Sequence, residues 1–122
     1  MLARSVSDLV ANACHAAPLD GATCRGEAGA EPRLHVHVGL WVAEDGRVAR
    51  ARYRATTCAA LVAYAEAACT LLEERGPVAA VEPAHLRRAV KDAHPVHHDR
   101  ADLVALAVAR ALAAPPRPGE TA

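Results

Sequence analysis

The stretch that decides the fold is Leu34–Thr57, which reads "LHVHVGLWVAEDGRVARARYRATT". Apolar and polar residues alternate along it, break off at an Asp-Gly pair and alternate again, as in a β-hairpin with a two-residue turn. Such a turn fixes the register, so one face of the ribbon is apolar and meets the core. On the other, polar face we expect His35 and His37 to be exposed to solvent and Trp41 to stack under an arginine.

The two-residue turn also predicts which residues lie opposite each other. On the core face we expect five pairs: Val42 with Ala49, Leu40 with Ala51, Val38 with Tyr53, Val36 with Ala55, and Leu34 with Thr57. On the polar face we expect four: Trp41 with Arg50, Gly39 with Arg52, His37 with Arg54, and His35 with Thr56.

Cys58 follows the hairpin and precedes a helical pattern. The apolar positions of that helix are Leu61, Ala65, Ala68 and Leu72, and Gly76-Pro77 predicts its end. A thiol at a helix N-terminus feels the positive end of the backbone dipole, which favours the thiolate that binds metal or attacks sulfur. Cys58 is therefore a candidate site residue; the alternative is a small buried core residue. Cys69, about 16 Å further along the helix axis, is expected to fill the core.

Three further helices are predicted around the hairpin. The first spans Ser7–Ala17 with Ser7 as its N-cap, a short one begins at Pro83, and the last spans Arg100–Ala113 with Asp99 as its cap. The last helix is expected to bury Leu103, Leu106, Val108 and Leu112.

The glycine-rich stretch Leu19–Pro32 has neither helical nor strand period, and it predicts a mobile loop that carries Cys24. Helices must then cover one face of the hairpin, so the expected class is α+β, a small antiparallel sheet with helices packed on one face. We expect a single domain over residues 1–114 and a flexible, proline-rich C-terminal tail over residues 115–122.

The composition excludes several classes of partner. The chain of 122 residues has 14 basic and 14 acidic side chains, so it has no electrostatic footprint for nucleic acid or an anionic membrane. Aromatic residues make up 2%, so there is no platform for stacking bases. No segment has the length and hydrophobicity of a membrane span or signal peptide, and the sequence predicts a cytoplasmic protein whose four cysteines are thiols.

The densest group of potential metal ligands is the segment "HPVHHD", which contains His94, His97, His98 and Asp99. Imidazole and carboxylate groups suit zinc or iron. A histidine-rich loop that is merely solvated is the alternative. Cys58 would strengthen the metal hypothesis if it lay nearby.

Taken in order, these segments resemble the family of IscU and the N-terminal domain of NifU, which are iron–sulfur cluster assembly scaffolds. The resemblance rests on "GEAGAEP" at Gly26–Pro32, the hairpin, "ARYRATTC" at Ala51–Cys58, and "PVHH" at Pro95–His98. It extends over the whole chain, and its most specific part is "DGRVARARYRATTCAALVAYAEA" at Asp45–Ala67. The resemblance implies the scaffold fold and a role in iron–sulfur cluster biogenesis.

The family's cluster ligands are largely missing from this chain. In the family, three cysteines and an aspartate hold the nascent cluster, with a histidine beside the third cysteine; here only the middle cysteine remains, as Cys58. The family's Cys-Gly-Asp falls on Pro32–Leu34. Its His-Cys falls on Asp99 and Arg100, or on His97–His98 if the loop is slipped by two residues.

A rebuilt site is the first consequence of this departure. It would combine Cys58 with side chains from the following set: His97, His98, Asp99, Cys24 and His35. Such a mixed set suits a single zinc or iron ion better than an iron–sulfur cluster, although two cysteines with two histidines would also match a Rieske-type cluster. We expect the segment from Pro95 to Asp99 to lie within reach of Cys58.

Two functions remain open at this point. The first is a non-enzymatic scaffold, or a metal or sulfur delivery factor, that uses Cys58; by resemblance its partner is a cysteine desulfurase or a client iron–sulfur enzyme. The alternative is a pseudo-scaffold that has lost the cluster ligands, binds no metal, and acts as an interaction subunit. The sequence contains no base–nucleophile pair or carboxylate dyad that would predict an enzyme.

Overall fold

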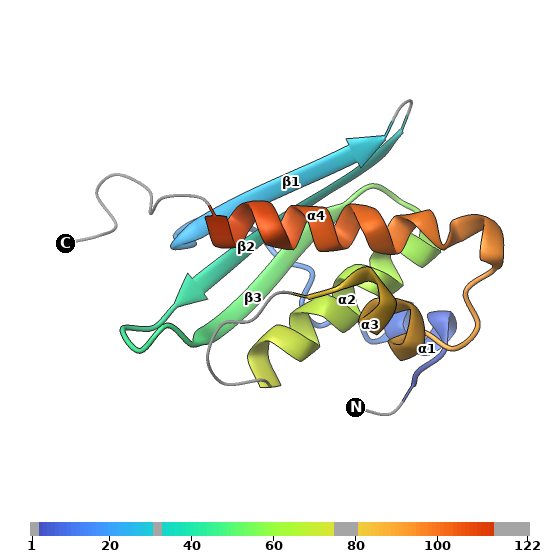
Figure 1. The fold of residues 1–122 in the computed structure, drawn as a ribbon, viewed down its shortest axis with the longest axis horizontal. Helices are drawn as coiled ribbons and strands as arrows, with labels where there is room; N and C mark the ends of the chain where they lie inside the picture. The colour runs from blue at the N-terminus through green and yellow to red at the C-terminus, as the bar shows by residue number, and fades with distance from the viewer. Residues whose placement is uncertain (1–2, 31–32, 75–80, 114–122) are drawn as a thin grey trace.

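The computed structural model describes residues 3–30, 33–74 and 81–113. The elements follow in the order α1 (Val6–Ala11), β1 (Cys24–Ala30), β2 (Leu34–Val42), β3 (Val48–Ala55), α2 (Ala59–Glu74), α3 (Pro83–Ala89), a short 3₁₀ turn (Pro95–His97) and α4 (Asp99–Ala113). The strands form one antiparallel sheet in the order β1-β2-β3 (Figure 1). The predicted α+β class is therefore confirmed. The predicted tail at 115–122 and the predicted helix end at Gly76-Pro77 lie outside the described residues.

The hairpin has the predicted register over most of its length. Val36 pairs with Ala55, Val38 with Tyr53, Leu40 with Ala51 and Trp41 with Arg50. Val36, Val38 and Leu40 are buried, His35 is exposed and His37 is partly exposed, as expected. The Arg50 guanidinium lies 4.9 Å from the centre of the Trp41 ring, which confirms the predicted stacking.

The predicted two-residue turn is wrong. The Gly46 N–H donates to the Ala43 carbonyl at 2.9 Å, the Ala43 N–H donates to the Arg47 carbonyl, and Gly46 has a φ of +87°. This is a three-residue loop in which a left-handed glycine forms a bulge. Val42 consequently pairs with Val48 and not with Ala49, and Val48 takes the buried position.

The structure also corrects the predicted loop at Leu19–Pro32, because its second half is strand β1. Cys24 pairs with Leu40 and is buried, so it does not lie in a mobile loop. The small residues have a packing role: a Cβ on Gly26 would lie 2.2 Å from the Ala107 carbonyl oxygen of α4. The glycine that suggested a loop is the residue that lets α4 lie directly against β1 (Figure 1).

The first helix is shorter than predicted. It spans Val6–Ala11, and its N-cap is Ser5 and not Ser7, because the Ser5 hydroxyl accepts a hydrogen bond from the Asp8 N–H at 3.0 Å. The chain then turns irregularly and pairs with β3 through a single parallel bridge between Ala16 and Tyr53. The Tyr53 N–H donates to the His15 carbonyl, and the Ala17 N–H donates to the Tyr53 carbonyl. This segment covers part of the free edge of β3 and brings His15 to the core.

Two long helices, α2 and α4, pack across one face of the sheet (Figure 1). The four predicted core positions of α2 are all buried. The predicted face of α4 is correct in part: Val108 is buried and Leu103 and Leu112 are partly buried against the core, but Leu106 is 42% exposed. The fully buried positions besides Val108 are mainly small residues: Ala101, Val104, Ala107 and Ala111. Short side chains face the sheet because α4 approaches β1 so closely. No helix in the described part of the chain is long and apolar enough to cross a bilayer.

Candidate functional site

Cys58 lies at the junction between β3 and α2, as the sequence predicts. Its carbonyl accepts the first helical hydrogen bond of α2, from the Val62 N–H at 2.9 Å, so Cys58 occupies the N-terminal cap position. Its side chain is partly buried against the core and remains partly open to solvent. The positive end of the α2 dipole is therefore next to an accessible sulfur.

Arg100 is the side chain of α4 that meets Cys58. Its pKa is raised above the ordinary value, first by a hydrogen bond to Asp99 and then by an interaction with the Cys58 sulfur. Arg100 Nη1 lies 2.6 Å from Asp99 Oδ1, and this guanidinium holds the pKa of the Asp99 carboxyl below its usual range. The start of α4 thus lies beside Cys58, but it presents a cation to the sulfur.

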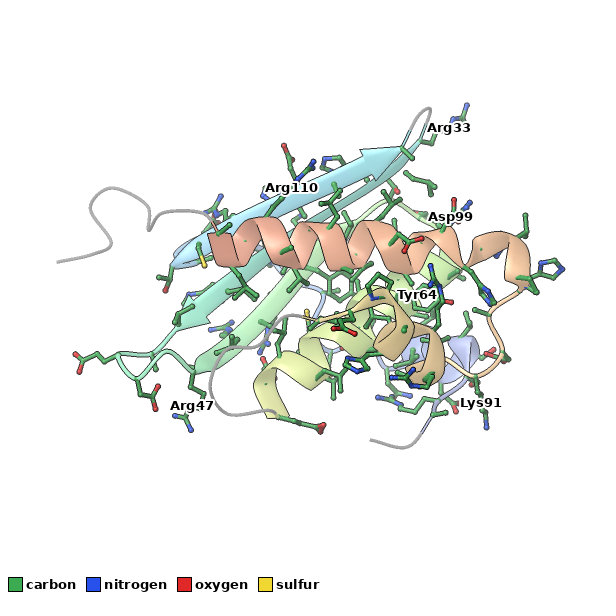
Figure 2. The ribbon with its side chains drawn as sticks, viewed as in Figure 1. Arg33, Arg47, Tyr64, Lys91, Asp99 and Arg110 are labelled. Carbon is green, nitrogen blue, oxygen red and sulfur yellow. The ribbon has the colours of Figure 1, made fainter. Side chains whose placement is uncertain are left out.

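Three of the predicted ligands lie at or just before the start of α4, where each has another contact. Asp99 is the first residue of α4 (Figure 2) and not its cap, and its carboxylate binds Arg100. The His97 ring packs edge-on against the His94 ring, with their centres 6.1 Å apart. The His98 carbonyl accepts from the Arg87 guanidinium. The segment from His94 to His98 therefore connects α3 to α4 through these contacts.

The other two predicted ligands lie elsewhere in the sheet. Cys24 pairs with Leu40, four residues or about 13 Å along β2 from Val36, where β3 ends. Burial raises the pKa of the Cys24 thiol. His35 is exposed and its Nε2 lies 3.2 Å from a carboxylate oxygen of Glu27. Cys24 is thus distant from Cys58, and His35, whose backbone pairs with Thr56, has its ring on Glu27.

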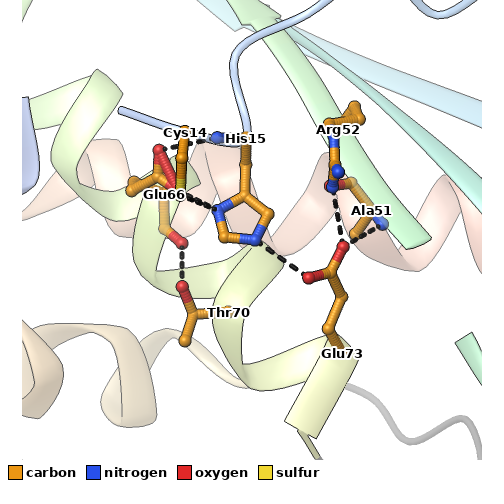
Figure 3. Close-up of polar contacts among 7 residues, drawn as sticks. All are labelled: Cys14, His15, Ala51, Arg52, Glu66, Thr70 and Glu73. Atoms are coloured by element: carbon orange, nitrogen blue, oxygen red, sulfur yellow. Dashed lines mark hydrogen bonds and ion pairs between the residues drawn. The ribbon is translucent and has the colours of Figure 1, made fainter. Parts of the chain in front are cut away.

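A different group of ligand-type side chains does converge. Within the described ranges, the Cys14 sulfur, a His15 ring nitrogen and a Glu66 carboxylate oxygen all lie within 4.8 Å of one another and could hold a metal ion. Cys14 is exposed, His15 is 9% exposed and Glu66 is 1% exposed. Glu66 reaches them from the middle of α2 (Figure 3).

His15 is held from both sides. Its Nδ1 contacts a carboxylate oxygen of Glu66, and its Nε2 lies 3.0 Å from Glu73 Oε1. The other oxygen of Glu73 accepts from the Arg52 guanidinium at 2.7 Å and from the Ala51 N–H at 2.8 Å (Figure 3). Burial tends to raise the pKa of Glu73, but these hydrogen bonds outweigh it and hold that pKa below its ordinary value.

Two buried side chains adjoin this group. Cys69 is buried on α2 as predicted, and burial, followed by the negative charge of Glu66, raises the pKa of its thiol. Tyr53 is 1% exposed, and its hydroxyl has no hydrogen-bond partner among the residues that the structure describes. Burial, followed by the charge of Glu66, raises the pKa of Tyr53. Both side chains therefore stay protonated and neutral beside the Glu66 carboxylate.

The cluster of Cys14, His15 and Glu66 is not among the sites that the sequence pattern predicts. The helix predicted over Ser7–Ala17 would have directed Cys14 and His15 by helical periodicity, whereas the observed chain leaves the helix at Ala11. The available signal was the Cys-His dipeptide together with Glu66, an acidic residue on the apolar face of α2. A buried acid needs a partner, so its presence there predicts a cation or an imidazole nearby.

Comparison with protein-family models finds no family that matches this chain, and comparison with curated proteins finds no matching relative.

Proposed function

We propose that the protein is a sulfur-delivery factor of iron–sulfur cluster biogenesis that carries one sulfur atom on Cys58. The observation that carries the proposal is the environment of this residue: a partly exposed sulfur at the N-terminus of α2, beside the Arg100 guanidinium. The resemblance to IscU and NifU scaffolds supplies the pathway and the partner class, a cysteine desulfurase. The presence of a single thiol at this site favours sulfur transfer over cluster assembly.

That choice follows from the number of thiols at the site. A [2Fe–2S] cluster is normally held by four protein ligands, mostly thiolates. Cys24 belongs to the far end of β1, and Cys69 is buried eleven residues further along α2. Cys14 belongs to the group with His15 and Glu66. Cys58 is left as a single thiol, which is sufficient to carry sulfur as a persulfide.

The transfer balances without an external oxidant. The Cys58 thiolate attacks the outer sulfur of a persulfide on the donor cysteine, forming a new S–S bond as the donor's own S–S bond breaks. The donor cysteine leaves as a thiolate, and the transferred sulfur keeps its oxidation state. The positive charge of Arg100 and the helix dipole stabilise the anionic persulfide left on Cys58.

A second candidate is the interaction subunit that has lost the chemistry. Arg100 favours it, because on the resemblance this residue stands where the family has a cluster cysteine, and its pairing with Asp99 gives the junction a purely structural explanation. This candidate predicts that no sulfur is retained on Cys58 and that partner binding survives its replacement.

The experiment treats the reduced protein with glutathione persulfide, or with a cysteine desulfurase and cysteine, and measures its intact mass. We expect one added sulfur per chain, none on Cys58→Ser, and an unchanged result for Cys14→Ser, which removes another exposed thiol. Equal sulfur on Cys58→Ser and on the unmodified chain would contradict the proposal. No added sulfur on either would favour the interaction subunit.

A further inference from the structure

The contacts of His15 leave three electron-pair donors facing one another. If the neutral ring donates its Nε2–H to Glu73, the Nδ1 lone pair faces the Glu66 carboxylate, with the Cys14 sulfur 3.4 Å from the same nitrogen. Such a group is held together either by an extra proton or by a cation. The proton would make His15 an imidazolium between two carboxylates; the cation would make the group a metal site.

The spacing of the donors fits a cation. In a tetrahedral zinc site with bonds of about 2.0 to 2.3 Å, sulfur, nitrogen and oxygen ligands lie about 3.6 Å apart. The Cys14 sulfur lies 3.4 Å from His15 Nδ1 and 3.9 Å from Glu66 Oε2. Two of the three edges are thus already close to the required length, and only the contact between His15 and Glu66 has to open.

The surroundings provide the support that metal-binding histidines have. Ligating histidines commonly donate their second ring N–H to a carboxylate, which fixes the tautomer and the ring orientation. Glu73 provides this carboxylate at 3.0 Å and is itself fixed by Arg52 and the Ala51 N–H. The carboxylate of Glu66 is fixed in the same way, because its other oxygen accepts from the His15 backbone N–H at 3.1 Å.

The buried hydroxyl of Tyr53 interacts with the Glu66 carboxylate. Within the described chain this hydroxyl has no well-formed hydrogen bond, although burial and then the charge and hydrogen bonding of the Glu66 carboxylate raise its pKa. A water molecule on an ion held by Glu66 would provide an acceptor. Cys14, on the solvent side, provides an entry path for the ion.

We propose that Cys14, His15 and Glu66 bind one Zn²⁺ ion with a fourth position open to water, and that Glu73 positions His15. A thiolate, an imidazole and a carboxylate are ligands that zinc accepts, whereas calcium and magnesium require oxygen. One thiolate and one carboxylate carry two negative charges, which balance the two positive charges of the ion. The site is separate from Cys58 and does not depend on the sulfur-delivery proposal.

The test titrates metal-free protein with zinc against a chromophoric chelator. We expect one equivalent of tightly bound zinc. Glu73→Gln should weaken binding by about 10- to 100-fold, and the ligand variants Cys14→Ser and Glu66→Gln should weaken it more. Cys58→Ser and His35→Ala are controls outside the site and should bind as the unmodified chain does. Circular dichroism checks that each variant is folded.

Two further measurements identify the cysteine that binds the ion. Zinc should protect Cys14 from alkylation and leave Cys58 reactive. Cobalt in place of zinc should show thiolate-to-metal charge transfer that Cys14→Ser lacks, which identifies the sulfur ligand even if Glu66→Gln fails to fold. Substoichiometric zinc, equal affinity of Cys14→Ser, or protection of Cys58 and not Cys14 would overturn the proposal. Preference for ferrous iron over zinc would overturn the choice of metal.

Discussion

Glu66 shows how one buried acid organises its neighbours. It lies in the middle of an otherwise apolar face of α2, 1% exposed, and both the ring and the backbone of His15 contact its carboxylate. Burying a charge is costly unless it is paired. The irregular course of the chain after α1 can be understood from this requirement, because it brings His15 onto the acid.

Replacing His15 with Ala should destabilise the metal-free protein by about 3 to 5 kcal/mol, because Glu66 is left as an unpaired buried charge. The measurement is the free energy of unfolding in urea at neutral pH. The double variant His15→Ala with Glu66→Leu should recover part of this loss, since it removes the charge as well. A loss below about 1 kcal/mol in the single variant would show that the pair is not critical.

Glu73 predicts a dependence of stability on pH. Its pKa in the folded protein is below the ordinary value of 4.5, so the unfolded chain takes up its proton first as the pH falls. The stabilisation is complete above that value and is lost as the pH falls towards the folded pKa. Urea unfolding from about pH 6 to about pH 3 should therefore show a smaller fall in stability for Glu73→Gln than for the unmodified chain. Parallel curves would contradict this.

At the scale of elements, the contact between β1 and α4 explains what could not be predicted from the sequence. The hairpin and α2 are predictable because their periodicities of two and of about 3.6 residues are regular. The Gly and Ala residues of β1 carry no hydrophobic periodicity, so they suggest a loop. Their small size allows α4 to pack closely on the strand. Because α4 is distant in sequence, local sequence patterns do not reveal this contact. The same contact places small residues of α4 against the sheet and leaves Leu106 exposed, contrary to expectation.

Gly26→Ala should therefore destabilise the fold by about 1 to 3 kcal/mol or more, because the new Cβ would meet the backbone of α4 at 2.2 Å from the Ala107 carbonyl oxygen. Glu27→Ala is the matched control, since Glu27 is the next residue of β1 and its side chain is exposed. Thermal unfolding of the two variants compares them. Equal melting temperatures would show that α4 does not approach the strand so closely.

The two cysteines of the β3–α2 region should differ in reactivity. Cys58 is partly exposed at the start of α2, whereas Cys69 is buried within the helix and burial raises the pKa of its thiol. Iodoacetamide at neutral pH, followed by peptide mapping, should label Cys58 well before Cys69. Cys24 should also react slowly, because it is buried in β1. Labelling of Cys69 first would contradict the placement of both residues.

At the scale of the whole molecule, two sites of different character lie at different points along α2. The Cys58 site lies where α2 and α4 both begin, whereas the Cys14, His15 and Glu66 group lies where the segment after α1 meets the middle of α2. The position of Cys58 could be predicted from the sequence, but its neighbouring side chains could not. Sequence neighbours suggested histidines as its partners, while the three-dimensional contact is made by the next residue along, Arg100.

The measurement that tests the central claim most directly is the location of transferred sulfur in the unmodified, zinc-treated protein. After a brief reaction with a persulfide donor, peptide mass mapping compares all four cysteines in one sample. The account predicts that the added sulfur is on Cys58, and that Arg100→Gln lowers its amount while leaving its location unchanged. Sulfur found mainly on Cys14, or spread evenly over the exposed thiols, would contradict the assignment of Cys58 as the carrier.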